Sequence, residues 1–456
     1  MAALCGFGLD AGAQSPSSHP SKPHESSSGQ DSGRASGSDP HSGSDTSSNP
    51  SDQTSDAHEL NLPELLVRDL RLPTNIQAFA PRPDHAASDT ALKGFVEVPG
   101  TKIFFKLGIG ATTALAVTSK ALSSDTWFTT SAIPVRGQPN FDSPGPQSTA
   151  TANQSDISLE MRSKTELGPL KVLFNTSFAQ AHPSFGFHPN FAYAQLGGAL
   201  AGFTDSTFAD VDAYPKTLDF EGPNALVFSK HAVIRYSHTL GRNQKHRSHL
   251  SFALEQPGTN APSSAGQVRN LLPDGVVAWR AEGGWGHLQL AGLVRAVGIQ
   301  SQNNDNSQTV LGIGGNLTGA YHLFHKHTLQ FGVSGGQGIG AYLNDTGGGQ
   351  YDAALDRSGA LKAIPLLGAY AGLNWSWTHN LTSTATYGWL KLWDDDFDAS
   401  LGTTGFHRSQ YAALNLVAHP IKGLLVGIEG LWGYNRILGG RSGQAVRGQV
   451  TFQYRF

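Results

Sequence analysis

The sequence predicts an all-β fold, a transmembrane antiparallel β-barrel of about sixteen strands preceded by a disordered N-terminal extension. From about Gly94 to Phe456, segments of alternating polarity are separated by turns, and a period of two residues is the signature of a β-strand. Only 15% of the 456 residues are charged, whereas the usual share in water-soluble proteins is about 25%. No apolar run approaches the roughly 18 residues that a membrane helix requires, so a helical membrane protein is excluded.

The last segment shows the alternation most clearly. Its apolar residues share one face and its polar residues the other: Val446, Val450, Phe452, Tyr454 and Phe456 oppose Arg447, Gln449, Thr451, Gln453 and Arg455. A soluble β protein turns such an apolar face toward its core, whereas a transmembrane barrel turns it toward lipid and its charges toward a wet lumen. The C-terminal Phe resembles the assembly signal of bacterial outer-membrane proteins, which favours the membrane barrel.

Sixteen segments fit the strand pattern. They are 102–117, 154–166, 169–181, 190–197, 198–204, 226–239, 248–256, 274–283, 286–297, 309–322, 327–340, 361–377, 380–391, 408–419, 422–435 and 444–456. Seven short connections alternate with eight longer ones, which is typical of outer-membrane barrels and places both termini on the periplasmic side. A barrel of eight strands is filled by its own side chains, whereas sixteen strands leave an aqueous channel.

The first 93 residues divide into three parts. Residues 1–13 resemble the remnant of a signal peptide, because Ala11, Gly12 and Ala13 provide small residues at a cleavage position, and we expect the natural start to lie upstream. Residues 14–58 are rich in Ser, His and Asp, a composition that predicts disorder. Residues 59–93 predict a short periplasmic helix over 59–72 and a linker, and the barrel follows at 94–456.

Metal sites receive little support from the sequence. Irregularly spaced histidines in the N-terminal stretch (His19, His24, His41 and His58) leave weak metal capture as the alternative to a solvated linker. A cluster of acids at 394–398 leaves a calcium site as the alternative to a solvated extracellular loop, but the spacing of a calcium-binding loop is absent. We therefore predict neither a metal nor another cofactor.

Other function classes are disfavoured by composition and motif. A net charge of −3 without a basic block argues against a nucleic-acid partner, and a single Cys argues against a disulfide framework. No Gly-x-Ser-x-Gly motif precedes a helix, so no catalytic residue is assigned. A barrel hydrolase is the minor alternative.

One stretch resembles a known family. Residues 203–236 contain Pro215, Thr217-Leu218-Asp219-Phe220 and Gly222-Pro223, followed by a strand ending in Ile234-Arg235-Tyr236. This pattern is similar to the DcaP-like family of trimeric outer-membrane porins, as are Glu255-Gln256-Pro257 and Val98-Pro99-Gly100-Thr101. The family implies a sixteen-stranded homotrimer that takes up small anionic solutes, dicarboxylates in particular. Lys230-His231 departs from the Arg-Gln that the family tends to have.

Strand parity selects the charges that face the lumen. Parity places Arg235, Arg280, Arg295, Arg162 and Arg447 on lumen-facing sides, and the predicted solute path contains these five residues together with Lys230. Arginine suits carboxylates because its planar fork forms two parallel hydrogen bonds. The alternative is that these cations only pair with Glu160, Glu255, Glu282 and Glu429.

The predicted constriction loop spans 205–225. Asp219 and Glu221 belong to its acidic set, and opposed acids and bases across a constriction would create a transverse field. The alternative is that both carboxylates cap turns or anchor the loop to the wall. The sequence leaves open whether this loop enters the lumen.

These observations predict a porin of the bacterial outer membrane, with its N-terminal extension in the periplasm. Small anionic solutes, outer-membrane lipid and two further copies of the chain are the expected partners. The alternative is a structural or adhesive barrel with a blocked lumen, whose loops bind a surface partner.

Overall fold

The computed structural model describes residues 92, 94–122, 124, 127–138, 141–142, 145–181, 184–242, 246–262, 265–300, 307–324, 326–347, 349–393 and 401–456. The expectations for residues 1–91, which include the signal remnant, the Ser/His/Asp-rich stretch and the helix at 59–72, lie outside the described residues. So does the acidic cluster at 394–398. No helix in the described part of the chain is long and apolar enough to span a membrane.

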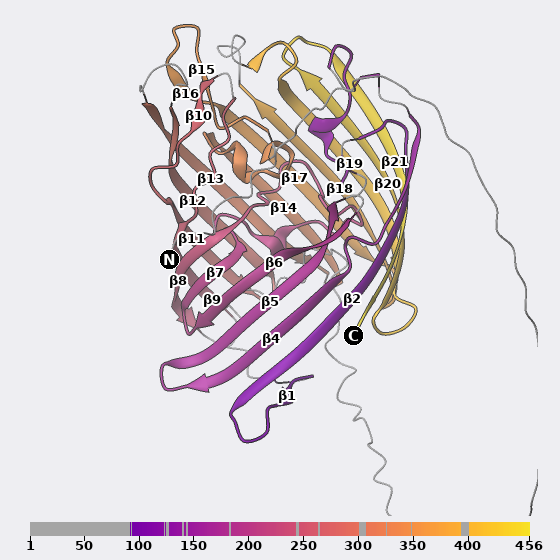
Figure 1. The fold of residues 1–456 in the computed structure, drawn as a ribbon. Coiled ribbons are helices and arrows are strands. Elements are labelled where there is room, and N and C mark those ends of the chain that lie inside the picture. Colours follow the sequence, from indigo (N-terminus) through magenta and orange to yellow (C-terminus); the bar gives the residue numbers. More distant parts are fainter. Residues whose placement is uncertain are drawn as a thin grey trace, which may run out of the picture. The chain divides into compact units, whose positions relative to one another are not determined.

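Sixteen long antiparallel strands close into a barrel (Figure 1). They are β2 (Ile103–Thr118), β4 (Asp156–Thr165), β5 (Gly168–Ala181), β6 (Ser184–Leu196), β7 (Ala199–Asp205), β8 (Lys230–Arg242), β9 (His246–Glu255), β11 (Asp274–Gly283), β12 (Gly286–Gln300), β13 (Ser307–Leu323), β14 (His327–Gln337), β17 (Pro365–Ser376), β18 (Leu381–Leu392), β19 (Phe406–Ala418), β20 (Leu424–Ile437) and β21 (Ser442–Arg455). The last strand pairs with the first over Gly110–Thr118 and Arg447–Arg455, which closes the ring. The predicted fold class is confirmed.

The connections at one end of the barrel are short, as the sequence predicted, whereas those at the other end vary in length, since the link between β20 and β21 spans only 438–441. In the described part of the chain, short turns lie at 166–167, 197–198, 284–285, 377–380 and 419–423, and the connections after β8 and β13 are short as well. Four long loops connect strands at the other end of the barrel. They are L1 (119–155), L3 (206–229), L4 (256–273) and L6 (338–364).

One strand begins earlier than predicted. The sequence pattern placed its start at 190, but β6 begins at Ser184 and continues the β5 hairpin. The pairing passes from Asn175–Phe191 to Thr176–Pro189 with a shift in register, so a bulge accommodates Pro189 within the strand.

Short elements lie at the ends of the barrel and within the loops. They are β1 (Val96–Glu97), β3 (Gln147–Thr151), β10 (Gln267–Val268), the β15–β16 hairpin (Ala353–Leu355 and Leu361–Ala363), three 3-10 turns η3 (Thr130–Ala132), η4 (Val211–Ala213) and η6 (Gly340–Tyr342), and the helical turn α2 (Asn344–Gly347). The predicted strand 361–377 merged β16 with β17. The chain leaves the hairpin at Ile364, whose N–H donates to the Asp352 carbonyl, before β17 begins.

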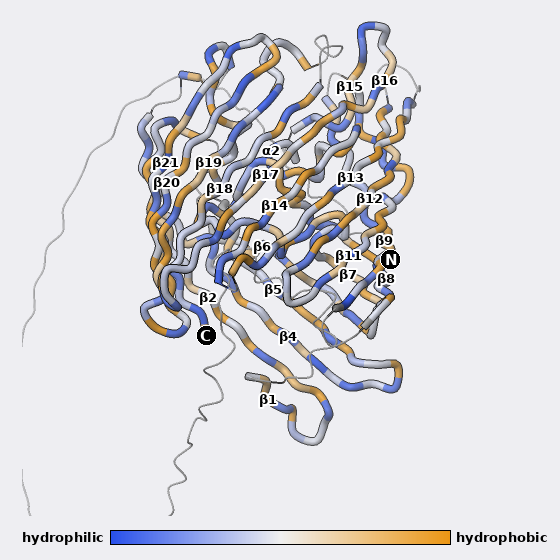
Figure 2. The backbone as a smooth tube through the Cα atoms, turned by 180° about the vertical axis from the view of Figure 1, so that it is seen from behind, coloured by the Kyte–Doolittle hydropathy of each residue, from blue (hydrophilic) through white to orange (hydrophobic). Residues whose placement is uncertain are grey.

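The outer face of the barrel is apolar. Along β11 and β12, Trp279 and Leu290 are 37% and 53% exposed, whereas Arg280 and Arg295 are only 7% and 2% exposed. Figure 2 shows the same alternation of apolar and polar residues along the strands. The parity prediction therefore holds for the outer wall, and this surface suits a hydrocarbon environment.

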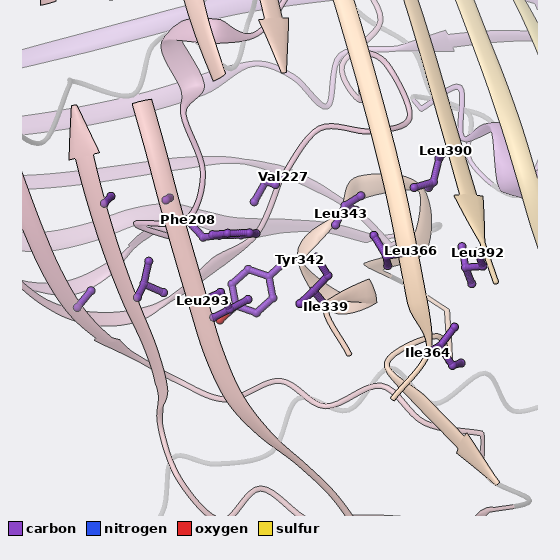
Figure 3. Packing of buried hydrophobic residues seen from close by; sticks show 14 of the residues in the cluster. Phe208, Val227, Leu293, Ile339, Tyr342, Leu343, Ile364, Leu366, Leu390 and Leu392 are labelled. Atoms are coloured by element: carbon purple, nitrogen blue, oxygen red, sulfur yellow. The ribbon is translucent and has the colours of Figure 1, made fainter. Parts of the chain in front are cut away.

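The inner face is not uniformly polar. Apolar side chains of the wall, among them Val276, Leu293 and Leu366, are buried inside the barrel against Phe208 of L3 and Tyr342 of L6. Figure 3 shows Leu293 and Ile339 on either side of Tyr342. The expectation of charged residues facing a wet lumen is therefore wrong for this part of the wall, because the loops pack against it and exclude water.

We expect Val294→Arg to destabilise the barrel. Val294 lies mid-strand on the outer face of β12 and is 53% exposed, and an arginine at such a lipid-facing position costs about 2–4 kcal/mol. Reversible unfolding in lipid vesicles measures the loss. Gln267→Arg, on the exposed β10 outside the ring, is the control and should change stability by less than about 0.5 kcal/mol.

Candidate functional site: the loops inside the barrel

Loop L3 lies inside the barrel along the inner wall. Inward amides on three strands bind its main chain: Asn316 on β13 donates to the Phe208 carbonyl at 2.8 Å, Gln330 on β14 to the Tyr214 carbonyl at 3.2 Å, and Asn415 on β19 to the Lys216 carbonyl at 2.8 Å. The loop therefore follows one arc of the wall, which answers the question that the sequence left open.

Inward glycines make room for this path. A Cβ added at Gly372 on β17 would lie 2.5 Å from the Pro215 Cβ, and one at Gly388 on β18 would lie 2.9 Å from the Pro223 Cβ. Such distances are too short for real Cβ contacts, so the backbone of L3 approaches the wall only because these positions carry no side chain.

Arg280 anchors the first part of L3. Its guanidinium binds the carboxylates of Asp210 and Asp212, each at 2.8 Å, and lies 3.5 Å from Glu282. The second oxygen of Asp210 accepts from Thr318 at 2.8 Å and contacts the His287 Nε2 at 2.9 Å. Burial alone would raise the pKa of Asp210, but Arg280 and His287 hold it well below its usual value.

Arg295 anchors L4 and L6. Its side chain is fully buried and forms ion pairs with Asp274 and Asp352, both at 3.2 Å. It also donates to the Gly258 carbonyl of L4 at 2.6 Å and lies over the ring of Tyr342. Burial raises the pKa of the Asp352 carboxyl, although Arg295 opposes this effect.

Arg447 anchors L1. Its Nε donates to the Thr118 hydroxyl at 2.9 Å, one Nη donates to the Ser124 carbonyl at 3.4 Å, and the guanidinium lies over the ring of Phe128. The guanidinium of this residue is therefore directed at the start of L1.

Asp219 and Glu221 lie in the middle of L3 and are buried. Asp219 accepts from the Phe128 N–H and the Tyr411 hydroxyl, both at 3.1 Å, and Glu221 accepts from the Thr129 hydroxyl. The Asp219 N–H in turn donates to Glu429 on β20 at 2.7 Å. Both carboxylates thus contact L1, and that of Asp219 also contacts the wall through Tyr411.

The remaining predicted cations lie on another arc of the ring. Arg162 on β4 binds Glu160 at 2.7 Å, and the same carboxylate lies 3.7 Å from Lys171 on β5. On β8, Lys230 lies 3.7 Å from Asp205 and contacts the rings of Phe191 and Phe228, and Arg235 is buried. In the strand order, β4, β5 and β8 stand opposite β13, β14 and β19, which hold L3.

Sequence reasoning missed three residues of this interior. Lys171 could have been found, because it shares the inward parity of Leu173 and Asn175 on β5. Asp345 and Asp352 carry no such signal, since each lies in L6 outside any long strand and its contacts come from distant parts of the chain.

We expect Gly372→Ala to displace L3. The added methyl group would overlap Pro215, and overpacking of this kind costs about 1–3 kcal/mol. The displaced loop should narrow the lumen and lower the single-channel conductance. Gly430→Ala on β20 is the matched control, because nothing lies within 4 Å of its Cβ position; equal conductance in both variants would contradict the close approach.

We expect Arg280→Met to destabilise the barrel by about 3–5 kcal/mol, because it leaves two carboxylates beside an apolar side chain. Adding Asp210→Asn should restore part of the loss, since the two effects are coupled.

Because the pKa of Asp210 is lowered, the contribution of this ion pair to the stability of the barrel is present above the ordinary pKa of an aspartate. It is lost only as the pH falls through the lowered value. Urea unfolding in vesicles of the wild type, Arg280→Met, Asp210→Asn and the double variant measures the coupling. If the two single losses of stability simply add up in the double variant, the coupling is contradicted.

Comparisons with known proteins agree on the fold. No family model matches the sequence, and no curated protein does either. The crystal structure of the outer membrane channel DcaP of Acinetobacter baumannii matches with a TM-score of 0.67 and 18% identity, over 78% of this chain and 97% of that chain. An anion-selective porin from Comamonas acidovorans matches over 78% of this chain and 100% of that chain, with a TM-score of 0.48 and 11% identity. The chain has the fold of the DcaP channel, as its resemblance to the DcaP-like porins predicted.

Proposed function

We propose that this chain is an outer-membrane porin, a passive channel for small hydrophilic solutes that prefers anions, dicarboxylates in particular. The fold and the apolar outer wall support the channel. The anion preference is supported by one observation: the acidic side chains of L3 point toward the wall and L1.

The carboxylates of L3 are turned toward the wall and L1. Asp210 and Asp212 bind Arg280, while Asp219 and Glu221 are buried and accept hydrogen bonds from L1. An acidic loop in a pore would disfavour anions if its charges faced the solute. In this arrangement L3 occupies the lumen while directing its negative charge away from the solute path.

The opposite arc carries a group of cations. Arg162 and Lys171 lie 2.7 and 3.7 Å from the carboxylate of Glu160. On β8, Lys230 lies near Asp205, and Arg235 lies near both Asp205 and Glu255. Glu255 is held by L3, since it accepts from the Ser206 hydroxyl and the Thr207 N–H, both at 2.6 Å. A cationic wall raises the local concentration of anions and speeds their uptake.

We assign different roles to the predicted arginines. Lys230 and Arg162, which are partly exposed, contact the solute on the opposite arc, and the arginine fork suits the two oxygens of a carboxylate. Arg235 is buried beside them and acts on the solute through its charge. Arg280, Arg295 and Arg447 act indirectly by holding L3, L4, L6 and L1 in place. Dicarboxylates as the preferred class, the homotrimer and the periplasmic position of the N-terminal extension rest on the sequence resemblance to the DcaP-like porins.

Planar-bilayer recording tests the proposal. In a salt gradient the wild-type reversal potential should take the sign that favours chloride. Arg235→Gln and Lys230→Gln should each lower the anion-to-cation permeability ratio by about twofold to fivefold, which is on the order of 1 kcal/mol or less in a wet lumen. Arg269→Gln, exposed in L4 after β10, is the control and should leave the ratio unchanged.

Two outcomes would contradict the proposal. Cation selectivity in the wild type would remove the anion preference. Silent bilayers with correctly folded protein would instead favour the rival function, a structural or adhesive barrel with a blocked lumen, which agrees with the many loop contacts inside the ring.

A further inference from the structure

Three loops meet at a group of buried carboxylates. Asp219 and Glu221 come from L3, Asp345 comes from α2 in L6, and L1 supplies the donors at residues 128–131. We call these carboxylates and donors the carboxylate junction. The three carboxylate residues are 1%, 3% and 4% exposed, so the junction excludes bulk water.

Asp345 is the centre of the junction. Its carboxylate accepts from the Thr130 hydroxyl at 2.7 Å, the Ser131 N–H at 3.1 Å and the Ser409 hydroxyl of β19 at 2.6 Å. Its own carbonyl accepts from the Ser131 hydroxyl at 2.6 Å. One side chain therefore ties L6 to L1 and to the wall.

L3 and L6 are joined directly beside it. The Asn344 amide donates to the carbonyls of Glu221 and Pro223, at 3.2 and 2.9 Å. The backbone continues the contact, since the Asn344 N–H donates to the Leu226 carbonyl at 3.0 Å and the Phe228 N–H donates to the Tyr342 carbonyl at 2.9 Å. A movement of L6 is therefore transmitted to L3.

The charges around the junction are mostly negative. Among the described residues, Asp219 and Asp345 form no ion pair and accept only from neutral donors. Glu429 on β20 adds a fourth carboxylate next to Asp219, and Tyr411 on β19 faces the same residue. Arg447 on β21 is the cation that acts on both Asp219 and Glu221.

We propose that the carboxylate junction is a proton-controlled latch, closed when its carboxylates hold protons and released when they ionise, and that its release frees L1 and L6 to change the conductance of the pore. The latch goes beyond solute selectivity, although its effect on conductance rests on the proposed channel function.

The acid–base properties of the loop carboxylates support this direction. Burial raises the pKa of Asp219 to about 6 and that of Asp345 above its usual value, and burial together with the neighbouring Asp345 and Asp219 raises the pKa of Glu221 well above its usual value. The folded junction therefore favours the protonated forms. Its stability is greatest at acid pH and falls as the pH rises from the ordinary to the raised pKa values.

Amide hydrogen exchange in vesicles tests the latch without relying on conduction. The N–H groups of Phe128 and Ser131 donate directly to Asp219 and Asp345, so their protection reports the closed state. After correction for intrinsic exchange, we expect protection to fall about tenfold or more between about pH 5 and pH 8.5, which corresponds to a difference of one pKa unit or more. Over the same range, single-channel records should change from steady openings to flickering between levels.

Charge-neutral variants identify which carboxylates of the junction must hold a proton to close the latch. Asp345→Asn and Glu221→Gln should each retain protection and steady openings at the higher pH. Asp356→Asn is the control, because this carboxylate lies in L6 on the β15–β16 hairpin, bound to Lys362 at 2.9 Å and outside the junction. In the Asp356→Asn variant, amide protection should depend on pH as it does in the wild type.

The outcomes separate the latch from the porin proposal. Silent bilayers with pH-dependent protection would reject the channel and support the latch as a loop switch. Protection that is independent of pH in the wild type, or that titrates unchanged in both Asp345→Asn and Glu221→Gln, would overturn the latch even if the channel conducts.

Discussion

A ring of sixteen strands is too wide to be filled by its own inward side chains, and this width determines what the rest of the molecule does. The wall satisfies its own backbone hydrogen bonds by closing β21 onto β2, which a lipid environment requires. The interior is left to the loops. L1, L3, L4 and L6 reach it, and each needs anchors that survive burial.

The anchors explain why so many charges lie inside the barrel with little exposure. Arg280 binds L3, Arg295 binds L4 and L6, and Arg447 binds L1, and each finds carboxylate, carbonyl or aromatic partners there. Removing a buried charge from water is costly unless it is paired. The pairing with Arg280 turns Asp210 and Asp212 of L3 toward the wall, so the anchoring of this loop and the proposed anion preference rest on the same charge arrangement.

The sequence predicted the wall far better than the interior. Period-two alternation identified all sixteen long strands and the outward direction of residues such as Trp279 and Leu290, because that pattern is local and one face meets lipid. The bulge at Pro189 was missed, since a proline interrupts the pattern without ending the strand. Parity also directed Arg280 and Arg295 inward, but it does not reveal their partners.

The candidate site depends on contacts that no local pattern encodes. Asp219 meets Phe128 and Tyr411, which lie 91 and 192 residues away in the sequence. Asp345 lies in a four-residue helical turn without strand parity. The resemblance to the DcaP-like porins marked 203–257 as special, and this stretch does contain L3, but only the folded chain shows which way the side chains of that loop point.

Thiol accessibility tests most directly the claim that L3 turns its carboxylates from the lumen while the opposite arc faces the solute. The single native Cys5 is first replaced by Ser, and Lys230→Cys and Asp219→Cys are then compared in folded protein in vesicles. A small anionic thiol reagent should modify the cysteine at 230 rapidly and the one at 219 very slowly. Rapid modification at 219 with protection at 230 would contradict the account.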